Sequence, residues 1–297
     1  MDWRKIPFPE RKALLEYIRN AGAEVSASKG YFRLFFDGAD AERIKEAVLD
    51  SSLDDIFDKG EVLRHSSQSY RIVTSVKTRL EGMSGEVFIK RVIRKNREYG
   101  AHYLFRFAGS IRGAIAGERM RRAGIDVPSD LFIEEKRKGP FLKSEYMVTN
   151  YLPNLRTLNQ VLREESDLES KLNGMIPVLA EMMGKMHSSG VTHRDFHFDN
   201  IYLRTDEQGN ECFGLCDFLD AKVYNGEIPE KYIYNEFWEI LKSIYAVLSG
   251  KGISPVLCCE RLYEEYHRWR KAHDCAREDH SRIMDGVMNK LKSNFQG

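Results

Sequence analysis

Residues 190–203 read Gly190-Val-Thr-His-Arg-Asp-Phe-His-Phe-Asp-Asn-Ile-Tyr-Leu203. Within this stretch His193, Arg194, Asp195 and Asn200 form the pattern H-R-D-x-x-x-x-N. Before it, methionine and leucine residues recur at the spacing of one helix face, which predicts a helix with a methionine-rich core face that stops at a glycine. The pattern therefore follows a buried helix, and it combines a basic group, a carboxylate and an amide.

Two further motifs stand in fixed order around this loop. Upstream, Val87-Phe-Ile-Lys90 lies on the second strand of a predicted hairpin, with strands over Tyr70–Thr78 and Glu86–Ile93. Downstream, Leu215-Cys-Asp-Phe-Leu219 reads as an apolar strand that delivers Asp217. Each motif alone is common, but the three in this order are specific, and through them the chain resembles the protein-kinase-like superfamily.

The chemistry of phosphoryl transfer explains why that superfamily uses these residue types. Transfer depends mainly on positioning and charge stabilisation, so a strand lysine, here Lys90, holds the phosphates of ATP. Asp195 accepts or orients the proton of the acceptor hydroxyl, with Arg194 beside it as an electrostatic organiser. Asn200 and Asp217 supply hard oxygen ligands for Mg²⁺, which keeps phosphates and waters as its other ligands.

Three departures separate the chain from protein kinases. No G-x-G-x-x-G loop covers the phosphates, and the corresponding segment, Arg64–Ser69, offers the hydroxyl and backbone N–H groups of Ser66 and Ser67 instead. Leu219 takes the place of the glycine that completes the Asp-Phe motif, and no A-P-E activation segment follows. These features favour a kinase of sugars or other small molecules over a protein kinase.

Four longer stretches within residues 61–250 narrow the resemblance. They are Phe88-Ile-Lys-Arg91, Arg121-Arg-Ala-Gly-Ile-Asp-Val-Pro128, Val148-Thr-Asn-Tyr-Leu-Pro153 and Met186-His-Ser-Ser-Gly-Val-Thr-His-Arg-Asp195. Together they look like the bacterial lipopolysaccharide core kinases, the Kdo/heptose kinase family. The resemblance implies that the chain uses ATP and Mg²⁺ to phosphorylate a Kdo or heptose sugar of the inner core. It implies a glycolipid or sugar acceptor as partner, and a cytoplasmic location peripheral to the cytoplasmic face of the inner membrane.

The resemblance also assigns roles at matching positions. The family's catalytic and metal-binding residues correspond to Asp195, Lys90, Asn200 and Asp217. Its hinge between two lobes, whose backbone meets the adenine, corresponds to Val148, Asn150 and Leu152. A glutamate on the helix after the strand lysine normally fixes that lysine, and the predicted helix Ser110–Ala123 contains one glutamate, Glu118.

The predicted elements divide the chain into three parts. Residues 1–60 form an accessory α/β segment, residues 61–151 are strand-rich, and residues 152–297 are mostly helical. The elements expected in the first part are helices over Pro9–Ala21 and Ala39–Leu49 and a strand over Tyr31–Phe36. We therefore predict an α+β, bilobal protein-kinase-like fold with a small β-rich N-lobe, a larger helical C-lobe and an N-terminal α/β extension.

Composition fits a soluble globular protein and argues against several other classes. The 46 Lys and Arg residues against 45 Asp and Glu leave a net charge of +1, which disfavours a dedicated nucleic-acid-binding protein. No apolar run is long enough to span a bilayer, and the N-terminus lacks the apolar region of a secretory signal. The five cysteines have neither disulfide-framework nor metal-site spacing, which indicates reduced thiols in a cytoplasmic protein.

Residues 90–122 concentrate positive charge. Two glutamates there, Glu98 and Glu118, stand against ten basic residues: Lys90, Arg91, Arg94, Lys95, Arg97, Arg106, Arg112, Arg119, Arg121 and Arg122. The stretch is a candidate contact for an anionic membrane surface or a phosphorylated lipid acceptor. A solvated basic face is the simpler interpretation, because most charge runs are of that kind.

Other interpretations of the motifs stay open. A soluble small molecule or a protein Ser/Thr side chain can be the acceptor in place of a core sugar. A non-catalytic pseudokinase that serves as a binding module is the alternative outside enzymes. The missing phosphate-loop glycines and Leu219 favour it, whereas the intact lysine, carboxylates and asparagine argue against it. Within the loop, His197 and Asp199 either contact the acceptor or serve loop packing.

Overall fold

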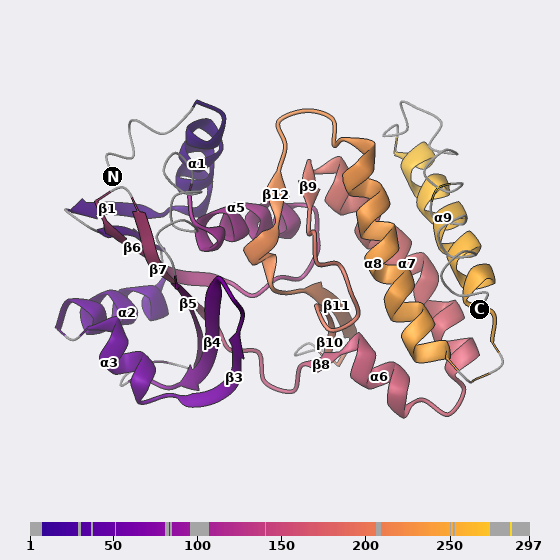
Figure 1. Cartoon of the computed structure of the whole chain (residues 1–297), viewed down its shortest axis with the longest axis horizontal. Helices are drawn as coiled ribbons and strands as arrows, with labels where there is room; N and C mark the ends of the chain where they lie inside the picture. The colour runs from indigo at the N-terminus through magenta and orange to yellow at the C-terminus, as the bar shows by residue number, and fades with distance from the viewer. Residues whose placement is uncertain are drawn as a thin grey trace. The chain divides into compact units, whose positions relative to one another are not determined.

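The computed structural model describes two compact units of the chain. It covers residues 8–28, 31–36, 38–50, 52–80, 83, 85–95, 107–139, 141–205, 209–249, 251, 253–273 and 286. Unit 1 comprises the described residues of Met1–Glu118 and Pro128–Pro153, and unit 2 those of Arg119–Val127 and Asn154–Gly297. Figure 1 shows the helices and strands of both.

Unit 1 is built on a seven-stranded sheet. Its strands are β1 (Glu24–Ser28), β2 (Tyr31–Phe35), β3 (Glu61–Ser67), β4 (Arg71–Thr78), β5 (Val87–Arg94), β6 (Asp130–Lys138) and β7 (Phe141–Asn150). They lie in the order β1-β2-β6-β7-β5-β4-β3, and neighbours run antiparallel. The apolar side chains of Val87, Ile89 and Val92 are buried, which suits an interior strand such as β5.

Three helices of unit 1 precede the strands that carry the site. They are α1 (Phe8–Ala21), α2 (Ala39–Asp50) and α3 (Leu53–Asp58). Ser52 and Asp55 form a capping box that starts α3. Asp54 of α3 then accepts hydrogen bonds from Lys136 Nζ at 2.6 Å and from the Tyr146 hydroxyl, so this helix is held against β6 and β7. The segment before residue 60 thus shares the sheet, and a division of the chain at residues 60 and 151 stays a prediction.

Two buried glutamates fix the start of α5 (Gly109–Arg122). Glu145 accepts a hydrogen bond from the Ser110 backbone N–H at 2.7 Å and pairs with the buried Arg94. Glu135 accepts from the Ala108 N–H at 2.5 Å, and burial raises the pKa of its carboxyl group. Because carboxylates favour helix N-termini and buried charges need partners, these contacts determine how α5 meets the sheet.

Unit 2 combines helices with short strands. Its elements are β8 (Arg156–Thr157), α6 (Leu158–Glu164), α7 (Leu168–Ser188), β9 (Val191–Thr192), β10 (Ile201–Thr205), β11 (Glu211–Leu215), the 3₁₀ helix η2 (Phe218–Asp220), β12 (Lys222–Val223), α8 (Glu230–Leu248) and α9 (Pro255–Ala272). β10 pairs with β11 and β8, and β9 pairs with β12, all antiparallel. In the described part of the chain, no helix has the length and apolar character needed to cross a membrane.

The methionine-rich face of α7 lies in the core of unit 2. Met182 is 4% exposed and Met183 and Met186 are fully buried, which confirms the predicted core stripe. α7 packs against α9, and a Cβ atom on Gly184 would overlap the indole ring of Trp269. This glycine therefore permits the close approach of the two helices.

Most predicted elements are confirmed within one residue of their expected bounds. The helices expected over 9–21, 39–49 and 110–123 and the strands expected over 31–36, 70–78 and 86–93 all occur. β4 and β5 form the predicted antiparallel hairpin, with Thr78 opposite Val87. The mostly helical region after residue 155 also contains the short strands β8–β12. β8, β9 and β12 have only two residues each, which leave no alternation in the sequence, so periodicity could not predict them.

Candidate active site

The loop between β9 and β10 is anchored from two sides. Arg194 has a φ of 68°, in the left-handed region that non-glycine residues rarely adopt. Its backbone N–H donates to Glu236 Oε1 on α8 at 2.6 Å. His193 Nε2 donates to the carbonyl oxygen of Cys216 at 2.8 Å, and burial lowers the pKa of this imidazole, which favours its neutral form. The backbone on either side of Asp195 is therefore tied to α8 and to the end of β11.

Glu236 is a buried carboxyl group that our sequence analysis did not single out. It is 1% exposed, and burial raises its pKa to about 8 despite hydrogen bonds from the Arg194 and His193 backbones. A signal was present in the sequence, because Glu236 shares a helix face with the buried Ile233 and Ile240. An acidic residue on an apolar face costs stability unless it has hydrogen-bond donors, so its position indicates an anchoring role.

Asp195, His197 and Asn200 form a hydrogen-bonded cluster in this loop. Asn200 Nδ2 donates to the Asp195 backbone oxygen at 2.8 Å and to Asp195 Oδ2 at 3.1 Å. His197 Nε2 lies 3.3 Å from Asp195 Oδ1. The hydrogen bond from His197 lowers the pKa of Asp195, and the same contact raises the pKa of His197. Asp195 is therefore an ionised carboxylate at neutral pH, held in orientation by two neighbours.

The β10–β11 hairpin brings Asp217 to the same place. Ile201 lies opposite Leu215 in this hairpin, and the Cys216 N–H donates to the Asn200 carbonyl oxygen at 3.0 Å. Asp217 follows directly and adopts a φ of 63°, before η2 begins. Strand pairing thus places Asn200 and Asp217 at one end of the hairpin, although 17 residues separate them in the sequence.

The donors of this cluster suit a magnesium ion better than a transition metal. Asn200 uses its Nδ2 group for Asp195, which leaves the amide oxygen for a cation, and Asp217 adds a carboxylate. In the described residues, no three or more His, Cys, Asp and Glu side chains are grouped as metal ligands. Mg²⁺ commonly takes one or two protein oxygens and completes its octahedron with phosphates and water, so two such donors fit it.

Lys90 and Glu118 both belong to unit 1. Lys90 lies in β5 opposite Ser75 of β4 and Met147 of β7, and it is 8% exposed. Glu118 lies on α5 and is half-buried. A pairing of the two side chains stays a prediction.

The other predicted nucleotide contacts also lie in unit 1. Val148 is paired with β5 on one side and β6 on the other, so its backbone serves the sheet. Asn150 ends β7, and Leu152 follows it beyond the paired residues. Ser66 and Ser67 end β3, where Ser67 Oγ accepts a hydrogen bond from Lys95 Nζ at 2.8 Å. These residues thus belong to unit 1, whereas Asp195, Asn200 and Asp217 belong to unit 2.

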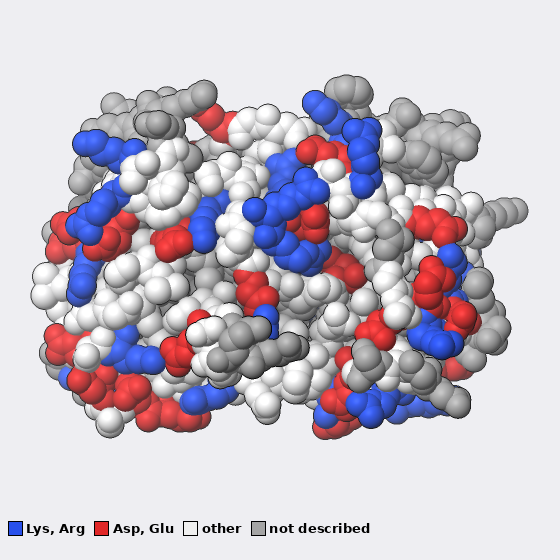
Figure 2. Space-filling model, turned by 180° about the vertical axis from the view of Figure 1, so that it is seen from behind, with Lys and Arg blue, Asp and Glu red and all other residues white. Residues whose placement is uncertain are grey.

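The basic residues between positions 90 and 122 do not form one exposed face. Arg94 is 7% exposed and pairs with Glu145, and Arg91 Nη1 lies 3.5 Å from Asp54 Oδ1. Arg97 and Arg106 lie outside the described residues. Figure 2 shows the Lys and Arg side chains of one face in patches that Asp and Glu border. The positive charges of Arg91 and Arg94 are therefore used in ion pairs within unit 1, and the interpretation as a solvated basic face is wrong for the buried Arg94.

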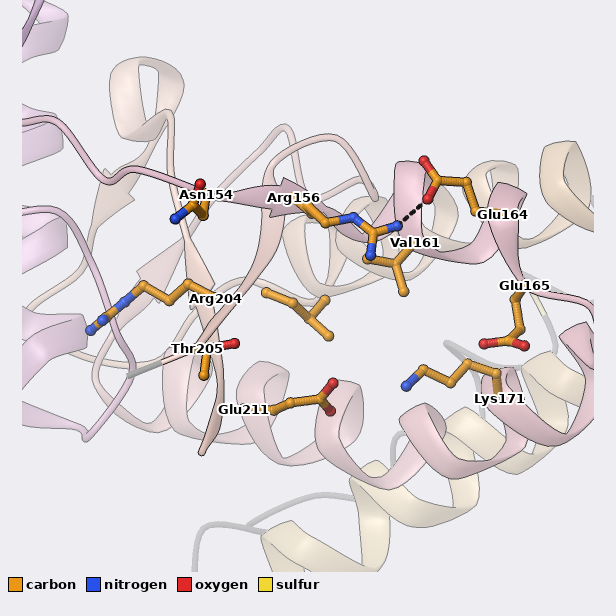
Figure 3. Close-up of a pocket in the computed structure, with 10 residues that line it drawn as sticks. Asn154, Arg156, Val161, Glu164, Glu165, Lys171, Arg204, Thr205 and Glu211 are labelled. Carbon is orange, nitrogen blue, oxygen red and sulfur yellow. Dashed lines mark hydrogen bonds and ion pairs between the residues drawn. The ribbon is translucent and has the colours of Figure 1, made fainter. Parts of the chain in front are cut away.

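A polar pocket lies elsewhere in unit 2 (Figure 3). Its volume is about 310 Å³, and β8, α6, α7, β10 and β11 contribute to its wall. Lys171, Glu165 and Glu211 point into it, while Arg156 pairs with Glu164 at its edge. No predicted site residue lines this pocket, and its charges are mixed, so we assign it no part in the chemistry.

Comparison with known proteins gives three findings. The model of the lipopolysaccharide kinase (Kdo/WaaP) family matches residues 57–243. The chain is 35% identical over 86 residues to ribosomal protein S6 kinase alpha-1 of Mus musculus and of Homo sapiens. The aligned residues cover 29% of this chain and 12% of each of those kinases. The solved structure of WaaP in complex with acyl carrier protein matches with a TM-score of 0.59 and 17% identity, over 85% of this chain and 96% of that one. The structural match confirms the predicted α+β, kinase-like fold class.

Proposed function

This chain belongs to the lipopolysaccharide kinase (Kdo/WaaP) family, as the resemblance indicated, and from that membership we propose that it transfers the γ-phosphoryl group of ATP to a sugar hydroxyl of the lipopolysaccharide inner core. The sugar is a Kdo or a heptose. The observation that supports this best is the cluster of Asp195, Asn200 and Asp217 in one anchored loop and hairpin.

Asp195 is the proposed catalytic base. The acceptor oxygen attacks the γ-phosphorus, its proton passes to the Asp195 carboxylate, and the bond to the bridging oxygen of ADP breaks with the electron pair leaving on ADP. The lowered pKa of Asp195 makes it a weak base, so most of its contribution is to orient the hydroxyl. Arg194, fixed through its backbone by Glu236, adds positive charge next to the base.

Asn200 and Asp217 are the proposed magnesium ligands. Bound Mg²⁺ would neutralise charge on the phosphates of ATP. The contribution of the chain is to hold two oxygen donors at one hairpin end before the nucleotide arrives.

Unit 1 supplies the proposed nucleotide contacts. Lys90 would hold the phosphates, with Glu118 as its partner, and Ser66 and Ser67 would cover them. For the adenine, Leu152 is favoured over Val148, because the backbone of Val148 is engaged with strands on both sides.

We propose the cytoplasmic face of the inner membrane as the place of action, since the proposed acceptor is a membrane glycolipid. Sedimentation with anionic vesicles tests this. The WaaP structure contains an acyl carrier protein, and we propose a protein partner of that kind here as well, which co-purification tests.

Transfer of labelled γ-phosphate to a panel of acceptors tests the function. The panel holds lipid A bearing Kdo, heptosylated core, free sugars and a generic protein substrate, each also run with Asp195→Asn. We expect label on a core glycolipid that disappears in the variant.

The alternatives predict other patterns in the same assay. Label on protein alone, or on a soluble sugar alone, would show that the protein is a kinase whose acceptor is not the lipopolysaccharide core. Absence of label on every acceptor, together with absence of Mg²⁺-dependent ATP binding, would favour the pseudokinase.

A further inference from the structure

Three cationic side chains of unit 2 converge on the ring of Tyr232. Lys222 Nζ lies 4.7 Å, Lys231 Nζ 5.0 Å and Arg194 Cζ 5.9 Å from the centre of this ring. They come from three segments, namely β12, the first turn of α8 and the loop after β9. Figure 1 shows β12 beside β9, as their pairing requires. The fold therefore collects separate positive charges at one place, which we call the Tyr232 cluster.

The Tyr232 cluster lacks acidic partners in the part of the chain that the structure describes. None of its three cations forms an ion pair with a carboxylate there, whereas Lys185 pairs with Glu181 and Arg204 with Asp126 in the same unit. Lys222 Nζ donates to the Tyr232 hydroxyl oxygen at 3.2 Å, so the hydroxyl keeps its own hydrogen to donate. Three cations and one hydroxyl donor, with no anion among them, form a site of positive potential.

This cluster is connected to the loop that carries the proposed base. Arg194 directly precedes Asp195, and the same Glu236 contact that holds the loop fixes the Arg194 backbone. Lys222 lies opposite Thr192 in the β9–β12 pair, one residue before the loop begins. The side chains of Arg194 and Lys231 are exposed and that of Lys222 is half-buried, so the positive charges are open to solvent.

We propose that the Tyr232 cluster binds an anionic group, a carboxylate or a phosphate, carried by the acceptor glycolipid. This inference rests on the proposed function and specifies which acceptors it uses. A guanidinium group binds either anion in a two-pronged manner, and the two lysines add point charges. The anion would hold the acceptor while its hydroxyl lies at Asp195, so the cluster selects sugars that already carry negative charge.

The test uses the double variant Lys222→Gln/Lys231→Gln, which leaves the loop and the metal ligands intact. With Kdo-bearing lipid A we expect the KM for the acceptor to rise about tenfold or more, with the KM for ATP and kcat little changed. The charge-matched control is Lys171→Gln/Lys251→Gln, which removes one lysine from the first turn of α7 and one from beyond the end of α8, each more than 15 residues along the chain from the β9 and Tyr232 ends of those helices. The wild-type KM should also rise with salt, and that of the double variant less.

Modified acceptors identify the anion. If the methyl ester of the Kdo carboxylate abolishes the difference between wild type and double variant, the carboxylate is the ligand; if dephosphorylation does so, a phosphate is. An equal KM in both proteins for the unmodified acceptor would overturn the proposal. The proposal would also be overturned if the rise in KM were accompanied by weaker sedimentation of the double variant with phosphatidylglycerol vesicles. The two lysines would then bind the membrane surface and not the acceptor.

The proposed function and this inference fail separately. Titration calorimetry of the acceptor without ATP measures the Tyr232 cluster whether or not transfer occurs. Binding that the double variant loses supports the cluster even if no phosphate is transferred. If phosphate is transferred but the double variant binds the acceptor as the wild type does, the role of the Tyr232 cluster is rejected and the proposed kinase activity is retained.

Discussion

Arg194 and Asp217 adopt left-handed backbone conformations. They stand at the two places where the backbone turns at the proposed site. Such conformations cost a non-glycine residue about 1–3 kcal/mol and persist where the surroundings determine them. Glu236 binds the Arg194 N–H, and Cys216, just before Asp217, is bound to the Asn200 carbonyl. Backbone strain thus occurs directly before the proposed base Asp195 and at the proposed metal ligand Asp217.

The role of Asp195 is tested by Asp195→Asn. We expect kcat to fall by roughly 100-fold or more, because the base is lost, while ATP binding is little changed. The matched control is Asp58→Asn on α3, which removes an exposed carboxylate outside the loop and should affect turnover little. Steady-state kinetics with the labelled acceptor measure both. Retention of most turnover in Asp195→Asn would show that the base is another group.

Glu236 should make stability depend on pH. Its pKa is raised from 4.5 to about 8 in the folded chain, so its full contribution is present below the unfolded pKa and is lost as pH rises toward 8. The loss is about 1.4 kcal/mol per pH unit between those values. Glu236→Gln removes this titration, so the wild type should lose thermal stability relative to the variant between pH 5.5 and about 8.5. A pH-independent difference between the two melting temperatures would contradict the buried-acid assignment.

At the scale of elements, α7 supports the loop that follows it and carries the proposed base. Its methionine face and the close contact at Gly184 set its distance from α9, and the chain then turns through Gly190, with a φ of 69°, into β9. A Cβ atom at Gly190 would crowd the Tyr224 carbonyl oxygen. Two glycines therefore fix where the loop begins.

Two glycines of α7 give a matched pair of substitutions. Gly184→Ala should destabilise the protein by roughly 1–3 kcal/mol, because the added methyl group overlaps Trp269. Gly174 is exposed with open space around its Cβ position, so Gly174→Ala should stabilise by up to about 1 kcal/mol through helix propensity. Thermal unfolding measures both, and equal effects would show that α7 and α9 are not in close contact.

At the scale of the whole molecule, the residues proposed to bind the nucleotide and those proposed to bind the metal belong to different compact units. Lys90, Ser66 and Leu152 belong to unit 1, whereas Asn200 and Asp217 belong to unit 2. The helix α5 belongs to both units. Glu145 of unit 1 binds its start, and its residues from Arg119 on belong to unit 2.

Mg²⁺-ATP should raise the melting temperature of the protein. At a concentration 100-fold above Kd, binding to the folded state adds about 2.7 kcal/mol of stability. Asp217→Asn should lose most of this shift, since asparagine tolerates the left-handed backbone but lacks the charge for the metal. Asp220→Asn, three residues later, is the control. An undiminished shift in Asp217→Asn, or an undiminished shift after chelation of Mg²⁺, would discard the metal assignment.

The sequence by itself determined the fold class, most helices and strands, and the identity of the residues in the H-R-D-x-x-x-x-N loop. These depend on local spacing, as in the methionine face of α7 and the alternation of β5, and on motif order along the chain. The sequence also indicated that Asn200 and Asp217 have side chains suited to bind a metal ion. It did not show how strand pairing brings them together.

Only the tertiary structure revealed Glu236, the clustering of Lys222 and Lys231 with Arg194, and the sheet shared by β1, β2 and β5. Glu236 is 42 residues from its partner Arg194, and nothing local in α8 states which backbone it will bind. The three cations are likewise dispersed in the chain and meet only after β9 pairs with β12. Contacts of this kind depend on how distant elements pack, because burial and charge act through space and not along the sequence.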